Sequence, residues 1–259
     1  VTTDRNNANL IAHNPALESF PWQGTTLAGH IVRVFSVILG IWSVYLTWQL
    51  SRELYPQTKH IALLAAAIQA FTPMYMFITS SVNNDNLVIP LSTLAMLYMV
   101  RHVKRHSPEH VTTQDSSGHK VLPYLTLGTV IAFAVLTKYG AIVLLPLAGA
   151  VAAWDAWTHM APQWRETKKL LLKDLGYFLI RIITVILPTV IIAGWWFYRD
   201  YQLYNDWLGL NAFYAVLGTR DVTASFTQLW SERFAFMAGY WGNFGGLSVP
   251  LPNWIYHTL

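Results

Sequence analysis

Three histidines with helical spacing are the first residues that could carry chemistry. His102, His106 and His110 lie four residues apart, so one face of a helix could present three imidazoles to a metal ion. Ser107 and Pro108 interrupt that helix, and the neighbouring Lys and Arg side chains repel a cation. We therefore predict a solvated helix end here, with no metal site.

Two polar clusters at the ends of apolar runs are the next candidates. Asn83, Asn84, Asp85 and Asn86 precede one apolar run, and residues 137–139, Thr-Lys-Tyr, separate two others. An ionisable side chain at membrane depth indicates a functional site by default, because uncovered polar groups survive there only inside protein or around water. We predict that both clusters lie at the wall of an outward-facing cavity.

Each cluster also has a structural interpretation. Asn84 or Asp85 can cap the helix that starts at Asn86, because the side-chain oxygen accepts hydrogen bonds from free backbone N–H groups. Lys138 can extend its ammonium from a span to the outer headgroups. Both interpretations stay open for these residues.

The elements that must position these residues are six apolar segments. They span residues 29–50, 60–79, 86–100, 121–136, 140–154 and 176–197. The segments on either side of Lys138 and the one after Asp85 have about 15 or 16 apolar residues, fewer than the roughly 20 that cross a bilayer. We therefore expect their outer ends to lie below the membrane surface. Pro73 is expected to be tolerated within the second segment.

The composition is that of a multi-pass membrane protein. Hydrophobic residues make up 54% of the 259 positions, and 17 Lys+Arg with 13 Asp+Glu are too few for the surface of a soluble domain. The absence of cysteine excludes disulfides, thiolate nucleophiles and Cys-ligated metals. The predicted fold is an all-α polytopic membrane helical bundle with about six transmembrane helices.

The distribution of basic residues predicts an orientation. The connections at 51–59, 101–120 and 155–175 hold ten Lys and Arg, against five on the opposite side. By the positive-inside rule these connections are cytoplasmic, and both ends of the chain lie outside a cell (inner) membrane. Because the basic residues form no stripe, we predict the lipid bilayer as a partner and no nucleic acid.

The predicted organisation has three parts. Residues 1–28 form an extracytoplasmic loop and juxtamembrane segment, 29–197 the transmembrane bundle, and 198–259 an aromatic-rich extracytoplasmic segment. Between Trp207 and Trp254 no run of about 20 apolar residues occurs, so we predict interfacial helices on the outer leaflet. A continuous helix across residues 226–244 would contradict this prediction.

Several motifs share their order along the chain with a known enzyme family. They lie at 20–25, 30–40, 51–56, 81–87, 136–140, 194–200 and 204–209. This ordered set resembles bacterial C-type glycosyltransferases, polytopic enzymes similar to protein mannosyltransferases and aminoarabinose transferases. The likeness covers nearly the whole chain. It implies transfer of a sugar from a polyprenyl-phosphate carrier on the outer face of the membrane.

The resemblance implies roles for five substrate-binding residues. Lys138 and Arg199 are the two cations at the predicted outer mouth, where they would hold a phosphate that gains charge as the glycosidic bond breaks. Asp85 would bind sugar hydroxyls and has a weaker claim to be the base that activates the acceptor. Asn84 and Tyr139 complete the set. No catalytic residue, metal or cofactor is predicted.

Lys138 and Arg199 are expected to face one polar cavity that opens laterally to lipid, with Asp85 on its wall. In the competing interpretation, each cation reaches the headgroups separately, or Arg199 pairs with Asp200 or Asp206 at the surface.

The chain departs from these enzymes in its first outer loop. Family members carry an acidic catalytic motif there, followed by Pro-Pro-Leu-Tyr, and neither occurs here; Asp4 and Glu18 stand in other contexts. We therefore predict an internal fragment or truncated member that does not catalyse by itself. The alternative is a non-catalytic accessory or structural subunit of a larger membrane complex, with a lipid-linked sugar donor or other membrane subunits as partners.

Overall fold

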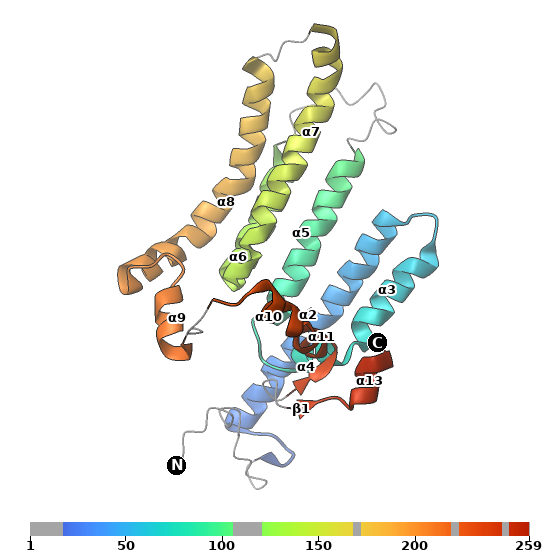
Figure 1. Ribbon diagram of the computed structural model, residues 1–259, viewed down its shortest axis with the longest axis vertical. Helices are drawn as coiled ribbons and strands as arrows, with labels where there is room; N and C mark the ends of the chain where they lie inside the picture. The colour runs from blue at the N-terminus through green and yellow to red at the C-terminus, as the bar shows by residue number, and fades with distance from the viewer. Residues whose placement is uncertain (1–17, 106–120, 168–171, 219–222, 245–248, 259) are drawn as a thin grey trace.

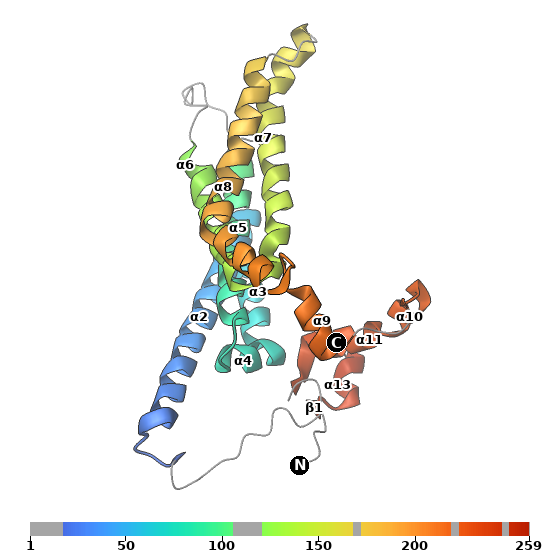
Figure 2. The same ribbon diagram turned by 90° about the vertical axis from the view of Figure 1, so that its left-hand side faces the viewer.

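The predicted all-α membrane bundle is confirmed. The computed structural model describes residues 18–105, 121–167, 172–218, 223–244 and 249–258, and most of these are helical. The bundle consists of α2 (Gly24–Leu54), α3 (Lys59–Phe71), α4 (Pro73–Ser80), α5 (Asp85–Arg105), α6 (Leu122–Thr137), the 3₁₀ helix η2 (Tyr139–Val143), α7 (Leu144–Thr167) and α8 (Leu172–Tyr204). Figures 1 and 2 show α5, α6, α7 and α8 running side by side along the longest axis of the molecule.

Four described helices are long and apolar enough to cross a membrane. They lie at Gly24–Leu54, Asp85–Lys104, Tyr139–Thr158 and Phe178–Tyr204, and the bent pair α3 and α4 could make a fifth span. Helix α6 is apolar but has only 16 residues. Its length agrees with the expectation of a short segment before Lys138. The expectation was wrong for the other two segments, because Asp85–Lys104 and Tyr139–Thr158 each have 20 residues and are long enough to cross a bilayer.

The second predicted segment is not one continuous helix, which corrects the sequence interpretation. It breaks between α3 and α4 with a bend of 62°. Thr72 is extended at the break (φ −66°, ψ 120°) because the ring of Pro73 disfavours helical geometry in the preceding residue. Helix α4 then packs on α2, where the Tyr75 hydroxyl donates to the backbone carbonyl of Gly40 at 2.7 Å.

Small side chains let the helices of the bundle approach one another closely. Helix α6 packs between α5 and α8, and α2 packs against α5. The backbones of α6 and α8 approach closely where they cross, because a Cβ atom on Gly128 would lie 2.4 Å from the carbonyl oxygen of Val185. Such contacts between small residues are typical of helix packing in membranes. Fully buried alanines line the same core: Ala95, Ala132, Ala134, Ala148, Ala152 and Ala193.

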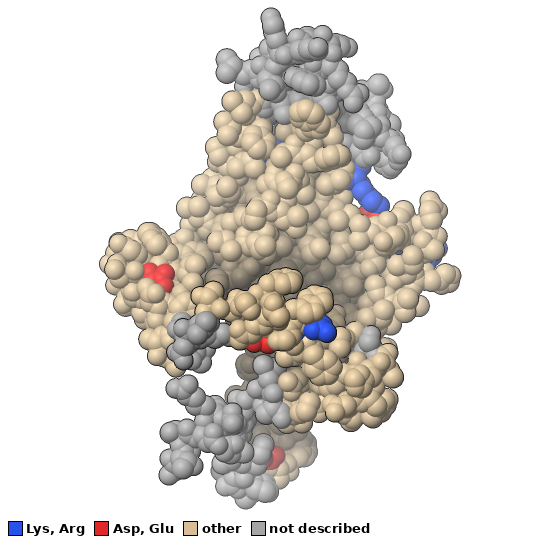
Figure 3. All heavy atoms as spheres, in the orientation of Figure 1, with Lys and Arg blue, Asp and Glu red and all other residues tan. Residues whose placement is uncertain are grey.

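The outer surface of the bundle is apolar. Exposed large hydrophobic residues follow α2 and α8 along most of their length, for example Ile31, Val34, Ile41, Ile183, Val190 and Ile191. Figure 3 shows the middle of one face almost free of charged residues. A surface of this kind matches the hydrocarbon core of a bilayer.

The described part of the tail forms short helices, as predicted. They are α9 (Leu210–Leu217), α10 (Phe226–Ser231), α11 (Arg233–Gly242) and α13 (Asn253–Thr258), with a two-residue strand β1 (Val249–Pro250). Glu232 separates α10 from α11, so no continuous helix runs from 226 to 244. Helix α11 packs on α4, and the rings of Phe77 and Phe244 lie 5.3 Å apart. The position of these helices on a leaflet stays a prediction.

These contacts define the two ends of the bundle. The tail helices lie at the end where α5 begins and α6 ends, here called the tail end (Figures 1 and 2). The opposite end, where α2 and α5 end and α6 begins, is called the basic end because Arg52, Arg101 and Lys104 lie there.

Candidate functional site

The loop before α5 is held by its own asparagines. The side-chain oxygen of Asn83 accepts from the backbone N–H of Asp85 at 3.0 Å, and the Asn86 side-chain amide donates to the Ser81 carbonyl at 2.7 Å. Asn86 is 2% exposed, and its side-chain oxygen has no hydrogen-bond partner among the described residues. These bonds fix Asp85 in the first turn of α5, where the positive end of the helix favours a carboxylate.

Lys138 meets this loop from the end of α6. The chain leaves the helix there in an extended conformation (φ −153°, ψ 118°) before η2 begins. The Lys138 ammonium donates to the Asp85 carboxylate at 2.5 Å, and the Asn84 amide donates to the Thr137 carbonyl at 3.3 Å. Three predicted site residues, Asn84, Asp85 and Lys138, are therefore brought together at the tail end.

Arg199 and Tyr139 lie outside this group of contacts. The Arg199 guanidinium contacts Asp200 at 3.3 Å and stacks over the Trp196 ring, 4.8 Å from its centroid. The ion pair of Arg199 is with Asp200 and that of Lys138 is with Asp85, so the two cations share no partner among the ion pairs of the described residues. Tyr139 is half exposed at the start of η2. The shared cavity of Lys138 and Arg199 stays a prediction.

The ion pair leaves Lys138 able to bind a second anion. The Lys138 and Asp85 side chains are 47% and 28% exposed, so both reach solvent. A lysine ammonium has three N–H donors, and the contact with Asp85 uses one. An anion beside Lys138 would accept another of them, while the Asp85 carboxylate holds the ammonium in place.

A buried polar cluster at the other end of the bundle was missed by the sequence interpretation. His102, Tyr124, Asp155 and Arg181, here called the tetrad, come from α5, α6, α7 and α8. His102 Nε2 lies 2.5 Å from the Tyr124 hydroxyl, which donates to Asp155, and Arg181 contacts the same carboxylate at 3.1 Å. The prediction that His102 is solvated was wrong, because only 9% of it is exposed.

The sequence held one signal for the tetrad. Asp155 lies at the edge of one apolar segment, and Arg181 lies within another. Charged residues at membrane depth usually pair with one another. His102 is buried because Tyr124 and Asp155 supply its hydrogen-bond partners. His106 and His110 lie outside the described residues. The structure therefore does not test whether the three histidines could share one helix face and bind a metal ion.

The comparisons with known proteins concern the part of the chain that contains both clusters. A family model for dolichyl-phosphate-mannose-protein mannosyltransferase matches residues 19–205. The chain belongs to this family. The match confirms the resemblance read from the sequence, and it includes Asp85, Lys138, Arg199 and the tetrad. No curated protein and no solved structure matches the chain.

Proposed function

We propose that this mannosyltransferase-family chain binds the phosphate of a polyprenyl-phosphate-linked sugar at the tail end of the bundle. The observation that carries the proposal is the ion pair between Lys138 and Asp85, 2.5 Å long and partly exposed, at the junction of two helix ends. Figure 3 shows the surface hollowed between the bundle and the tail helices. A lipid-linked phosphate needs such a cation near the membrane surface, with access from lipid.

The proposed role of Lys138 is to stabilise the departing phosphate. In the family reaction, an acceptor hydroxyl oxygen bonds to the sugar carbon as the bond from that carbon to the phosphate oxygen breaks. The carrier phosphate then gains negative charge, which a preorganised ammonium stabilises. Arg199 is proposed as the second cation, because its guanidinium has N–H donors beyond the one that contacts Asp200.

Asp85 is proposed to position Lys138 and to bind sugar hydroxyls, with Asn84 and Tyr139 beside it. Because the Asp85 carboxylate already accepts from the Lys138 ammonium, we assign the acceptor proton to no described residue. We further propose that the first-outer-loop acid of related enzymes has no equivalent in this chain and that the chain alone does not transfer sugar.

The proposed orientation places the tail end outside the cell membrane. The connections that hold the larger number of basic residues join helices at the opposite end, and such connections face the cytoplasm. This orientation puts Lys138 on the side where the lipid-linked sugar is expected.

The test is a binding titration of the purified chain in lipid nanodiscs with a polyprenyl-phosphate-linked sugar. Charge-assisted hydrogen bonds contribute about 1.5–3 kcal/mol, so Lys138→Met should weaken binding by about 10- to 150-fold. Lys138→Arg should retain more of the affinity. The matched control is Lys59→Met, because Lys59 is exposed and lies at the basic end.

Two results would overturn the proposal. Either the wild-type chain fails to bind the donor, or Lys138→Met binds as tightly as Lys59→Met. Both would favour the accessory-subunit alternative, for which purification in stoichiometric amount with other membrane subunits is the supporting observation. Sugar transfer by the purified chain would contradict the proposed lack of catalysis.

A further inference from the structure

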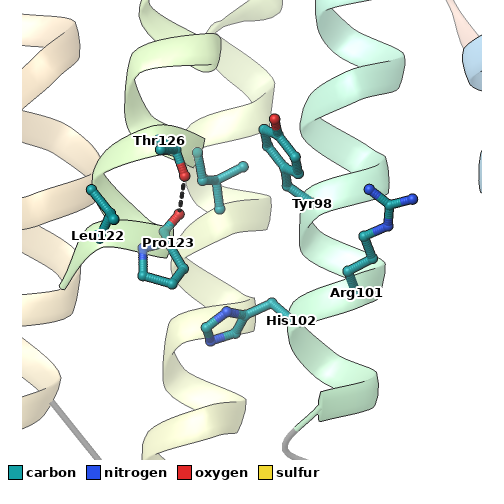
Figure 4. Close-up of a pocket in the computed structure, with 7 residues that line it drawn as sticks. Tyr98, Arg101, His102, Leu122, Pro123 and Thr126 are labelled. Carbon is teal, nitrogen blue, oxygen red and sulfur yellow. Dashed lines mark hydrogen bonds between the residues drawn. The ribbon is translucent and has the colours of Figure 1, made fainter. Parts of the chain in front are cut away.

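Two hollows meet at Arg101 at the basic end of the bundle. One has a volume of about 310 Å³ and lies between α2 and α5, lined by Trp48, Gln49, Arg52, Glu53 and Arg101. The other, of about 260 Å³, lies between α5 and α6 (Figure 4). Its lining shares Arg101 and adds Tyr98, His102, Leu122, Pro123, Thr126 and Leu127.

The first hollow has an excess of positive charge. Arg101 donates to the Glu53 carboxylate at 2.7 Å and approaches the Gln49 side-chain oxygen at 3.4 Å. Lys104 donates to the backbone carbonyl of Glu53 instead of to a carboxylate. Arg52 makes no ion pair with a described residue and lies over the Trp48 ring, 5.0 Å from its centroid. Two guanidinium groups and one carboxylate therefore line this hollow, and the Lys104 ammonium lies beside it.

Arg52 has no carboxylate partner among the described residues and is available to a phosphate. Its guanidinium carbon lies within cation–π distance of the Trp48 ring, and the side chain is exposed, so its N–H groups can reach a ligand. A planar guanidinium binds phosphate through two parallel hydrogen bonds, and Arg101 lies across the same hollow.

The second hollow is lined mostly by hydrocarbon groups and extends from the basic end toward the middle of the bundle. Leu122, Pro123 and Leu127 supply apolar lining, and Tyr98 and Thr126 lie about one helical turn deeper than Arg101 and Leu122. Figure 4 shows Tyr98 and His102 on the side of α5 that faces this lining of α6, whereas the Arg101 side chain extends on the other side of α5. A cationic hollow next to an apolar one fits an amphiphile rather than a free ion.

We propose that the basic end binds an anionic phospholipid of the surrounding bilayer. Its phosphate lies between Arg52 and Arg101, and an acyl chain enters the hollow between α5 and α6. A zwitterionic lipid is disfavoured because its own cationic group would meet the excess positive charge of Arg52, Arg101 and Lys104. This site is independent of the donor site, which lies at the tail end.

The experiment measures lipid retention by native mass spectrometry of the chain extracted from nanodiscs. The nanodiscs contain phosphatidylcholine with a minor fraction of phosphatidylglycerol. We expect the wild-type chain to retain phosphatidylglycerol preferentially, and Arg52→Gln to reduce this retention by about tenfold or more. Arg52 is exposed, so its replacement leaves the Arg101 and Glu53 pair intact. The matched control is Lys59→Gln, which removes an exposed cation outside both hollows.

Three results would overturn the proposal. Equal retention of phosphatidylcholine and phosphatidylglycerol would show that the hollows do not select an anionic lipid. Equal losses of phosphatidylglycerol retention in Arg52→Gln and Lys59→Gln would indicate that general surface charge, and not a specific site, retains the lipid. Displacement of the lipid by inorganic phosphate at equal concentration would assign the site to a soluble anion.

Discussion

Replacing Arg181 by methionine would leave the Asp155 carboxylate buried without its guanidinium. The two groups lie 3.1 Å apart, and their side chains are 12% and 1% exposed. At an effective dielectric constant of about 20, two unit charges at this separation attract each other by about 5 kcal/mol. Removing one partner of a buried pair typically destabilises by about 3–5 kcal/mol. Because His102 and Tyr124 still contact Asp155, we expect a loss of about 3 kcal/mol in the free energy of unfolding.

The assay is equilibrium unfolding in mixed micelles titrated with dodecyl sulfate and followed by far-ultraviolet circular dichroism. The matched control is Arg199→Met. The Arg199 side chain is 47% exposed and that of Asp200 is 12% exposed, so solvent around the guanidinium screens this pair, which contributes at most about 1 kcal/mol. The double variant Arg181→Met, Asp155→Leu should recover most of the stability, because apolar replacement of a whole buried ion pair is often neutral or stabilising.

Either of two outcomes would refute the electrostatic reasoning about the tetrad. One is a loss in Arg181→Met no larger than in Arg199→Met. The other is a double variant whose loss equals the sum of the two single losses, because groups that interact directly are not additive.

Three further predictions concern the packing and the tail. Gly128→Ala should lower the free energy of unfolding, measured in the same assay, by about 1–3 kcal/mol, because the new Cβ would overlap the Val185 carbonyl. Gly29→Ala is the control and should not lower it, because a Cβ at Gly29 meets open space. Tyr75→Phe should cost about 0.5–1.5 kcal/mol through the lost hydrogen bond to α2; an unchanged transition midpoint would contradict this. Backbone N–H groups around the start of α9 hold the pKa of Asp206 below its ordinary value, so their bonds stabilise the folded tail above that ordinary pKa. This stability should be lost as the pH falls through the lowered pKa, seen as faster amide hydrogen exchange in α9, and Asp206→Asn should abolish the pH dependence.

Much of the bundle could be predicted from the lengths of the apolar runs, because the backbone N–H and C=O groups of a chain in lipid must form their hydrogen bonds within helices. The short α6 and the proximity of the Asp85 and Lys138 loops follow from the same argument. The break at Thr72 was not predicted, because a proline in a span can be accommodated or can end the helix, and packing on α2 decides which. The tetrad was missed because its members come from four segments, and periodicity does not specify which helix faces meet.

The close crossing of α6 and α8 has a mechanical consequence for the tail end. Without a Cβ on Gly128, the two backbones interlock at Val185, so sliding of one helix along the other is sterically opposed. Lys138 directly follows the last residue of α6, and Arg199 lies near the end of α8, so the two cations are on helices that are packed together at this crossing. Asp85 is carried by a different helix. If Lys138 and Arg199 bind one anion as proposed, we expect the ligand to change the spacing between Lys138 and Asp85 more than the spacing between the two cations.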